Sequence, residues 1–298
     1  MGINKIIKER RSVREYKSKK VEENVINDLL NDFTNKKRLT DDIKINFGFI
    51  QDGKGLYEKL DGLVGYYGKL IKAPHYIYIT SEVKDGYLEN AGYIGEKLVL
   101  EATKLGLGTC WIEVSKNMDK VKEILSIEKD QEIIGLFTIG YPKKERKVGG
   151  VYDTEGKSLS PLTEFGYSNI DVKYTDAPIS GRKSIEDITY LNNWGQKATV
   201  EELEDRGIAE SFYYMRLAPS WGNRQPWKFI IRGEKIVLAV CKDEMVSEKI
   251  AKIEAGIAML YFELMIHESG IPGKWVIRNC DNEYNIPENY FIAGCYKI

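Results

Sequence analysis

Two stretches of the chain carry the same pattern of residues, and this internal repeat constrains the fold more than any other feature. Residues 91–113, AGYIGEKLVLEATKLGLGTCWIE, align without a gap with residues 255–277, AGIAMLYFELMIHESGIPGKWVI. Apolar residues recur at helical spacing in both stretches, which predicts two long helices that each end at a glycine before a short strand. The chain is therefore expected to contain two related halves. Identical residues fall at equal positions: Ala91 and Ala255, Gly106 and Gly270, Trp111 and Trp275.

The sequences before and after the two helices also agree. Arg10-Arg11-Ser12-Val13-Arg14 has a counterpart in residues 182–186, RKSIE, and each lies about ninety residues before its matching glycine. A β-rich run follows each predicted helix, and helices alternate with strands in both halves, which favours an α+β or α/β fold over a bundle or sandwich. Strands are expected at residues 45–51, 75–80, 132–140, 227–232, 235–240 and 290–296.

The segment between the halves reads as a long connection. Residues 143–180 are rich in Gly, Ser, Asp, Thr and Pro and show no sustained periodicity. A connection of this length is unusual inside one compact domain, so we expect it to cross from one half to the other. The predicted halves are residues 1–165 and 166–298. Two independent domains on a flexible tether are the alternative, which the complementary motifs described below disfavour.

Composition and charge exclude several classes of protein. The 44 basic and 45 acidic residues give a formal net charge of −1, so no global field attracts nucleic acid or an anionic membrane. No apolar run approaches the length of a membrane span, and the charged first twenty residues lack the apolar core of a signal peptide. We expect a cytoplasmic protein with neither a membrane nor a nucleic-acid partner.

Cysteine and histidine are scarce and scattered, which argues against a metal site and against histidine-based catalysis. The four cysteines form no C-x-x-C pair, so free buried thiols in a reducing compartment are expected. Only two histidines are present to serve as a general base or a metal ligand. An enzyme of this composition is expected to take its reactivity from an organic cofactor. These residues are Cys110, Cys241, Cys280 and Cys295, with His75 and His267.

Residues 10–14, Arg-Arg-Ser-Val-Arg, form the first motif that points to a ligand. They lie near the amino end of a segment that can be helical. Guanidinium groups and a hydroxyl at a helix start suit a phosphate, because the helix dipole and free amides favour an anion there. Taken alone, a basic and solvated helix start is the more common interpretation of such a motif.

Residues 218–227, APSWGNRQPW, form the second motif. Two prolines, a glycine and short polar residues exclude regular structure, and a hydrophobic strand follows at once. Such a loop presents amide and hydroxyl groups in fixed directions, as recognition of a flat polar heterocycle requires. The alternative is a rigid structural turn packed by two tryptophans.

Together these motifs resemble the fingerprint of the nitroreductase family. The resemblance lies in Arg-x-Ser-x-Arg near the start, the A-P-S-x-x-N-x-Q-P-W loop, the helix that ends in G-L-G before a strand, and I-G-Y-P at residues 139–142. It covers nearly the whole chain, once per half, and implies an α+β fold in which each half has a mixed β-sheet flanked by helices. The halves would pack about a pseudo-twofold axis through the two long helices.

The resemblance also implies a composite site. Family members are usually homodimers that bind FMN across the interface, one subunit supplying Arg-x-Ser-x-Arg and the partner supplying the Pro-Ser-x-x-Asn loop. This chain resembles such a dimer fused into one polypeptide. Residues 31–42 of the first half lack the loop motif, and Glu186 stands in the second half where Arg14 stands in the first. One site is therefore expected to be complete, in a monomer that acts as an intramolecular pseudo-dimer.

Family roles carried over position by position give the expected cofactor site. Lys69, taken alone, is more simply a surface lysine, and Arg146 lies in a charge run that is usually just solvated. Trp221 is bulkier than the family's usual small residue and is expected to narrow the substrate space. The phosphate is expected at Arg10, Arg11 and Ser12, with Arg146 as a further cation; the pyrimidine end at Arg14 and Lys69; flavin N5 at the backbone of Glu113 and Val114; and the ring beneath Pro219, Ser220 and Asn223.

The function implied is that of an FMN-dependent NAD(P)H oxidoreductase. NADH or NADPH would pass hydride to the flavin, and a nitroaromatic, quinone or similar flat electrophile would then take the electrons in ping-pong kinetics. No side chain need act as acid or base, and no metal is expected. The alternatives are an FMN-binding sensor or storage protein and a pseudoenzyme without turnover. The physiological acceptor and the choice between NADH and NADPH stay open.

Overall fold

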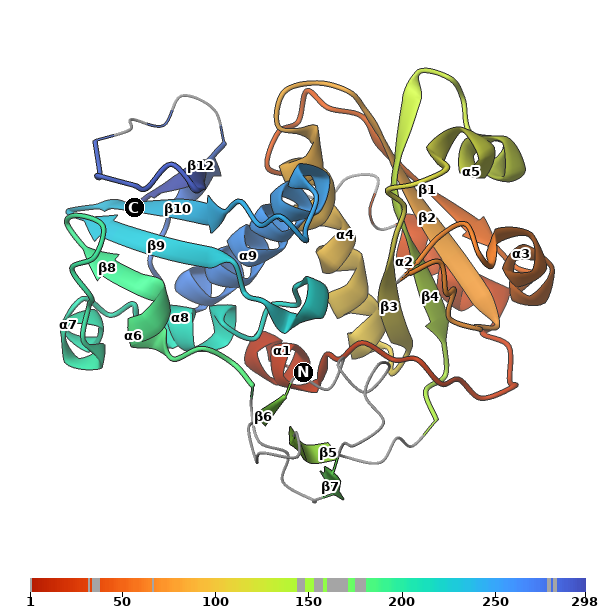
Figure 1. The fold of residues 1–298 in the computed structure, drawn as a ribbon, viewed down its shortest axis with the longest axis horizontal. Coiled ribbons are helices and arrows are strands. Elements are labelled where there is room, and N and C mark those ends of the chain that lie inside the picture. Colours follow the sequence, from red (N-terminus) through yellow and green to blue (C-terminus); the bar gives the residue numbers. More distant parts are fainter. Residues whose placement is uncertain are drawn as a thin grey trace.

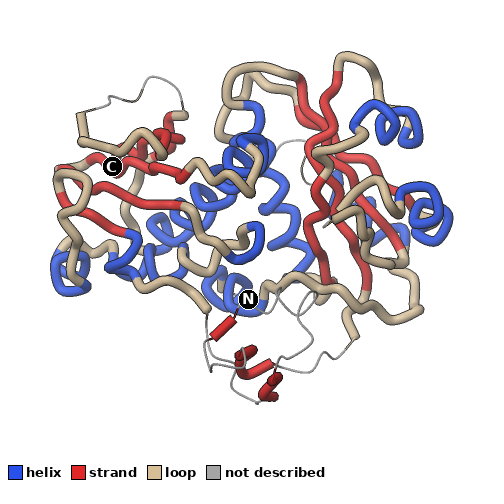
Figure 2. Tube along the Cα trace, in the orientation of Figure 1, coloured by secondary structure: helices blue, strands red, loops and turns tan. Residues whose placement is uncertain are grey.

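The structure of the protein is a computed structural model. It describes residues 2–31, 33, 38–65, 67–143, 148–152, 158–159, 171–174, 181–277, 280 and 283–298. Two β-sheets lie on either side of a central pair of long helices, α4 and α9 (Figure 1). Figure 2 shows the same arrangement by secondary structure, with the strands of these two sheets at the two sides of the molecule.

The first half forms a four-stranded sheet in the order β1-β2-β4-β3. All three strand pairs in it are antiparallel, so the prediction of a mixed sheet is wrong for these strands. The parallel contact that we find in this half is an isolated bridge between Ser12 and Thr109. The elements are α1 (Ile3–Glu9), α2 (Glu23–Asn31), β1 (Ile45–Ile50), α3 (Gly53–Leu60), β2 (His75–Glu82), α4 (Tyr87–Lys104), β3 (Gly108–Glu113), α5 (Met118–Leu125) and β4 (Gln131–Gly140).

The second half forms a five-stranded sheet in the order β11-β12-β10-β9-β8. Its β8–β9 pair is parallel and the others are antiparallel, so this sheet is mixed as predicted. The elements are α6 (Ile185–Ile188), β8 (Thr189–Leu191), α7 (Val200–Asp205), α8 (Ala209–Met215), the 3₁₀ turn η2 (Trp221–Asn223), β9 (Trp227–Arg232), β10 (Lys235–Cys241), α9 (Glu248–Glu268), β11 (Lys274–Val276) and β12 (Tyr290–Lys297). The six strands predicted from sequence are all present, within two residues at each end.

The connection between the halves contains three short strands that were not predicted from the sequence. They are β5 (Val148–Tyr152), β6 (Ser158–Leu159) and β7 (Asp171–Tyr174), and they pair as β6-β5-β7. Strands of two to five residues are too short to produce a periodic signal in sequence. The predicted boundary between residues 165 and 166 lies outside the described residues.

Helices α4 and α9 cross at two glycines that occupy equal positions in the repeat. A Cβ on Gly92 would overlap the backbone of Ile253, and a Cβ on Gly256 would overlap the backbone of Glu89. The two contacts are reciprocal, because residue 92 aligns with 256 and residue 89 with 253. Glycine therefore allows the helix backbones to touch at the crossing point.

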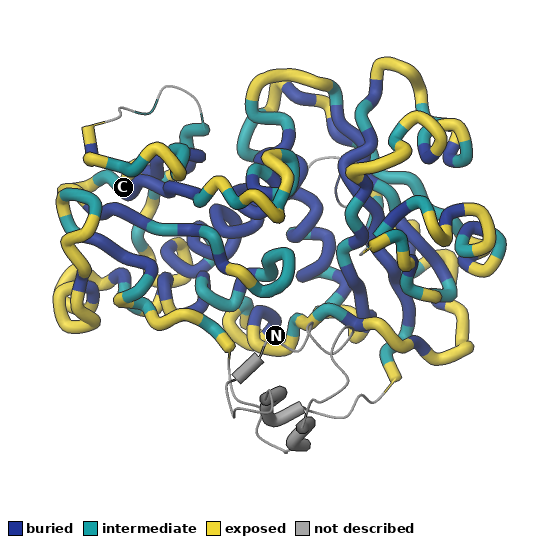
Figure 3. Tube along the Cα trace, viewed as in Figure 1, coloured by how far each residue is buried: buried dark blue, intermediate teal, exposed yellow. Residues whose placement is uncertain are grey.

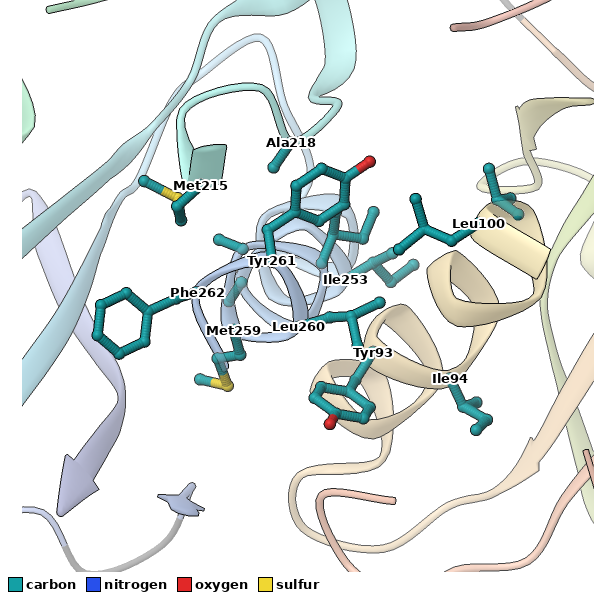
Figure 4. Packing of buried hydrophobic residues seen from close by; sticks show 14 of the residues in the cluster. Tyr93, Ile94, Leu100, Met215, Ala218, Ile253, Met259, Leu260, Tyr261 and Phe262 are labelled. Carbon is teal, nitrogen blue, oxygen red and sulfur yellow. The ribbon is translucent and has the colours of Figure 1, made fainter. Parts of the chain in front are cut away.

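The core of the molecule surrounds this crossing. Both helices are buried over most of their length, between the two sheets (Figure 3). Figure 4 shows Tyr93 and Leu100 on α4 lying close to Ile253, Leu260 and Tyr261 on α9. Because each half covers apolar surface of the other, the halves form one continuous core.

Two of the four cysteines do not match their prediction as free thiols. Cys280 and Cys295 form a disulfide that joins the segment after β11 to β12, with their Cα atoms 6.0 Å apart. Cys110 is a buried free thiol and Cys241 is a partly exposed one. The sequence spacing of 15 residues gave no indication that the fold brings Cys280 and Cys295 together.

Among the described residues, none of the helices combines the length and apolar character that crossing a membrane requires.

Candidate active site

A cavity of about 730 Å³ opens between the halves, where the end of β3 faces α9 and the loop before β9. The first half contributes residues from the segment after α1, from the Gly65–Ile71 loop and from residues 110–115. The second half contributes residues 219–222 and one face of α9. Of the residues predicted to hold a cofactor, these line the cavity: Ser12, Arg14, Lys69, Glu113 and Val114 from the first half, and Pro219 and Ser220 from the second.

The Arg-x-Ser-x-Arg segment is extended and follows a helix, so the prediction that it begins a helix is wrong. Helix α1 ends at Glu9, and the Val13 amide donates to the Thr109 carbonyl oxygen at 2.8 Å. Val13 is 2% exposed and packs against the backbone at Gly108. In the extended conformation, the Val13 amide is hydrogen-bonded and the Val13 side chain is buried. These two contributions outweigh the tendency of the segment to form a helix.

Arg10 and Arg11 do not line the cavity. The Arg10 side chain is 7% exposed, and its Nε lies 3.8 Å from a carboxylate oxygen of Glu96. Arg11 is exposed. Glu96 is fully buried at the interface of the halves, and it accepts hydrogen bonds from Trp111 Nε1 at 2.7 Å and from the Tyr261 hydroxyl at 3.0 Å. Burial raises the pKa of Glu96, and the Arg10 guanidinium opposes that rise.

The counterpart motif of the second half binds the loop rather than facing the cavity. Arg182 donates to the Ala218 carbonyl oxygen, and burial together with the nearby Arg10 lowers its pKa to about 10. The Lys183 amide donates to Gln225 Oε1 at 2.8 Å, and Lys183 Nζ donates to the Gln225 carbonyl oxygen at 2.9 Å. Ser184 caps α6 by accepting from the Asp187 amide. This motif therefore fixes the loop that carries Pro219 and Ser220.

Within the loop, Gln225 and Asn223 shape the backbone. The Gln225 amide donates to Ser220 Oγ at 2.9 Å, and its Nε2 donates to the Gly181 carbonyl oxygen at 3.1 Å. Asn223 has a φ of 57° and donates from Nδ2 to the same Gly181 oxygen at 3.0 Å. Asn223 is not among the residues that line the cavity, because its side chain bonds this neighbouring segment instead.

Two charged residues of α9 that were not predicted from the sequence also line the cavity. Lys249 Nζ donates to the carbonyl oxygens of Val114 at 3.2 Å and Ile133 at 2.7 Å, so it links α9 to the other half. Glu254 is 4% exposed and accepts a hydrogen bond from the Trp221 amide. Burial lowers the pKa of Lys249, and burial raises the pKa of Glu254 to about 8. The one available signal was a charged residue inside the apolar stretch of α9.

Two further expectations concern cations. Arg146, predicted as an additional phosphate contact, lies outside the described residues. In the part of the chain that the structure describes, no cluster of His, Cys, Asp and Glu side chains could hold a metal ion.

Comparison with known proteins identifies the family. The family model described as "Putative TM nitroreductase" matches residues 2–266 of the chain. The crystal structure of a "putative nitroreductase" from Thermotoga maritima is 22% identical, covers 100% of this chain and 94% of that chain, and has a TM-score of 0.56. An FMN-dependent nitroreductase from Clostridium difficile is 24% identical over 55% of this chain and 98% of its own, with a TM-score of 0.40. None of the curated proteins matches the sequence. With its family model matched over most of the chain and the nitroreductase fold in its structure, the protein belongs to the TM nitroreductase family.

Proposed function

We propose that the protein is an NAD(P)H oxidoreductase that binds FMN in the cavity between its halves. One observation carries this proposal: the residues predicted to hold a flavin come from both halves of the sequence, and seven of them surround a single cavity. Residues as far apart as Ser12 and Ser220 would meet in this way only if the halves cooperate in one site.

The residues around the cavity fit a flavin mononucleotide. The cavity volume of about 730 Å³ lies within the range of about 300–1,000 Å³ that is typical of cofactor and small-molecule sites. A phosphate needs donors such as a hydroxyl group, which Ser12 supplies at one wall, and Arg14 beside it supplies a cation to the pyrimidine end of the flavin. Lys69 adds a second cation, and the ring system can lie against the apolar side chains of Ile71 and Trp111.

FMN held in this cavity would supply hydride transfer between NADH or NADPH and a second substrate that replaces the first, which would give ping-pong kinetics. The cationic groups of Arg14 and Lys69 would stabilise negative charge on the ring when it is reduced. Pro219 and Trp221 line the cavity on the side of the second half. Apolar residues of α9, among them Ile250 and Ile257, favour flat electrophiles such as nitroaromatics and quinones.

We also infer that the chain is a fused dimer that works as a monomer with one flavin. The reciprocal contacts of Gly92 and Gly256 are those expected of two subunits related by a twofold axis. In the second half, the counterpart of the phosphate motif makes hydrogen bonds to the loop, because Lys183 donates to Gln225 from both its amide and its ammonium group. One half thus supplies the phosphate contacts and the other supplies the loop.

The proposal is tested by titrating FMN into the purified chain and following flavin fluorescence. Arg14→Gln removes a charged donor, and we expect it to weaken FMN binding about 10- to 100-fold, which corresponds to a charge-assisted hydrogen bond of about 1.5–3 kcal/mol. The exposed Arg206, at the end of α7, provides a matched control, and Arg206→Gln should bind FMN like the wild type. A wild-type chain that does not bind FMN would refute the proposed function.

A further inference from the structure

Glu254 is a buried carboxyl group in the wall of the cavity. It lies on α9 and is 4% exposed, and the residues of α9 beside it in the wall are the apolar Ile250, Ile253 and Ile257, together with Lys249. The catalytic scheme proposed above assigns it no role. A carboxyl group in such surroundings costs free energy unless its polar atoms find partners, so its presence calls for a specific reason.

The equivalent residue of the other half shows what this position requires for structure alone. Glu254 aligns with Asn90 in the repeat, and Asn90 is also buried. Asn90 Oδ1 accepts from the amides of Leu39 at 3.1 Å and Thr40 at 3.4 Å, and its Nδ2 donates to the Thr40 carbonyl oxygen at 3.3 Å. A neutral amide side chain therefore suffices to fasten a neighbouring loop at this position.

Glu254 fastens its own loop with only one of its two oxygens. Its Oε1 accepts from the Trp221 amide, and its Oε2 has no hydrogen-bond partner among the described residues. Because Glu254 lines the cavity, this second oxygen is the part of the side chain left for a ligand.

Within the described part of the chain, no cation forms an ion pair with Glu254. Lys249 pairs with Glu132 at 3.3 Å, and Arg224 pairs with Asp243. Burial raises the pKa of Glu254 to about 8, the Trp221 amide and Arg224 oppose this rise, and the negative charges of Asp243 and Glu113 add to it. At neutral pH the group is therefore mainly a carboxylic acid, which carries one O–H donor.

We propose that Glu254 recognises the electron acceptor by donating a hydrogen bond from its protonated carboxyl group to an oxygen atom of a flat acceptor, such as a nitro, quinone or carboxylate oxygen. This inference rests on the proposed function and adds a specificity-determining residue to it. The acceptor is favoured over the flavin as the partner, because Glu254 holds Trp221, which is expected to narrow the acceptor space. The residues predicted to hold the phosphate and pyrimidine end, Ser12, Arg14 and Lys69, come from the other half.

The test uses benzoate, a flat aromatic carboxylate, as the probe and isothermal titration calorimetry of the full chain loaded with FMN. Ionisation of Glu254 removes the donor and places two negative charges together, so the wild-type affinity for benzoate should fall about tenfold between pH 7 and pH 9. In Glu254→Gln, whose amide stays neutral, the affinity should not change with pH. Glu263→Gln is the matched control, because Glu263 is a buried carboxyl on the same helix that does not line the cavity.

Three results would overturn the inference. They are a wild-type chain that does not bind benzoate at pH 7, a wild-type affinity that is independent of pH, and an unchanged pH dependence in Glu254→Gln. FMN affinity measured over the same pH range separates the two possible ligands. If the pH dependence that needs Glu254 appears in FMN binding and not in benzoate binding, the acceptor is not its partner. A chain that binds no FMN at all contradicts the proposed function itself, and benzoate can then be titrated into the chain alone.

Discussion

Replacing Gly92 or Gly256 by alanine should weaken the packing of α4 against α9, although alanine is the better helix former. A Cβ on Gly92 would lie 2.8 Å from the carbonyl carbon of Ile253, and a Cβ on Gly256 would lie 2.8 Å from the carbonyl carbon of Glu89. Non-bonded carbon atoms prefer a separation of about 3.5–4.0 Å. The helix axes would therefore have to move apart by roughly 1 Å, and the core between the sheets would open with them.

Two opposing effects set the expected magnitude. Alanine in place of glycine inside a helix gains about 0.5–1 kcal/mol of intrinsic helix stability. Extra atoms forced into a packed core typically cost about 1–3 kcal/mol and sometimes more. The obstacle here is backbone rather than a side chain that can rotate away, so the cost should lie at the upper end of that range. We expect a net loss of about 2 kcal/mol in the free energy of unfolding for either variant.

The assay is urea denaturation followed by tryptophan fluorescence, with Lys104→Ala as a surface control on α4. Lys104 is exposed and its ion pair with Glu101 is 3.6 Å long, so its loss should change stability by less than about 0.5 kcal/mol. Because the two glycine contacts are reciprocal, Gly92→Ala and Gly256→Ala should lower the midpoint to a similar extent. If either variant were as stable as the wild type or more stable, α4 and α9 would not touch at these residues.

Two further substitutions test the loop and the α9 wall of the cavity. Glu254 has its pKa raised from 4.5 to about 8, so the folded chain binds this proton more tightly and loses stability as pH rises through that window, by on the order of 3 kcal/mol at pH 7. In thermal denaturation, the stability of Glu254→Gln relative to the wild type should therefore increase between pH 5 and pH 8 and then level off. A stability difference that does not change with pH would contradict the raised pKa. Gln225→Ala should lower stability by about 1–3 kcal/mol and weaken FMN binding, because it removes the buried Gln225 side chain, which accepts from the Lys183 amide and donates to the Gly181 carbonyl oxygen. Unchanged FMN affinity in that variant would show that Gln225 does not shape the site.

The parts of the fold with strong local patterns were predictable from sequence. The two long helices and the six strands follow from apolar periodicity and β-branched runs, and the glycine at the end of each helix marks where it stops. The short strands of the connection and the antiparallel pairing of the first sheet were not predictable in this way. Pairing direction depends on how the strands are brought together by the whole chain, which no local pattern records.

Residues of the candidate site could be predicted where the residue type itself suits a ligand. They could not be predicted where a distant partner residue determines the orientation of the side chain. Ser12 and Ser220 line the cavity, and each was proposed from its motif. Lys69 also lines it, and it was proposed from the family resemblance alone. Arg10 lies instead beside Glu96, which the motif gave no means of foreseeing. Asn223 adopts a positive φ and bonds Gly181, so its side chain serves the loop and not the cavity.

Glu254 became visible only in the folded chain. In the sequence it is one acidic residue in an apolar helix, and its alignment with Asn90 carried no functional meaning. The structure explains the alignment, because both side chains accept hydrogen bonds from a loop of their own half, and only Glu254 has an oxygen atom left to contact a ligand in the cavity. Comparison of equivalent positions in a repeat can thus indicate which of two residues has a function beyond stabilising the fold.

The most direct test of the central claim is the absorbance spectrum of the purified chain saturated with FMN and then freed of excess cofactor, recorded before and after anaerobic addition of NADH or NADPH. We expect flavin bands that correspond to about one FMN per chain and that bleach when the nicotinamide is added. Bands that persist would indicate a flavin-binding protein without this activity. A chain that retains no flavin would contradict the claim that its two halves build one FMN site.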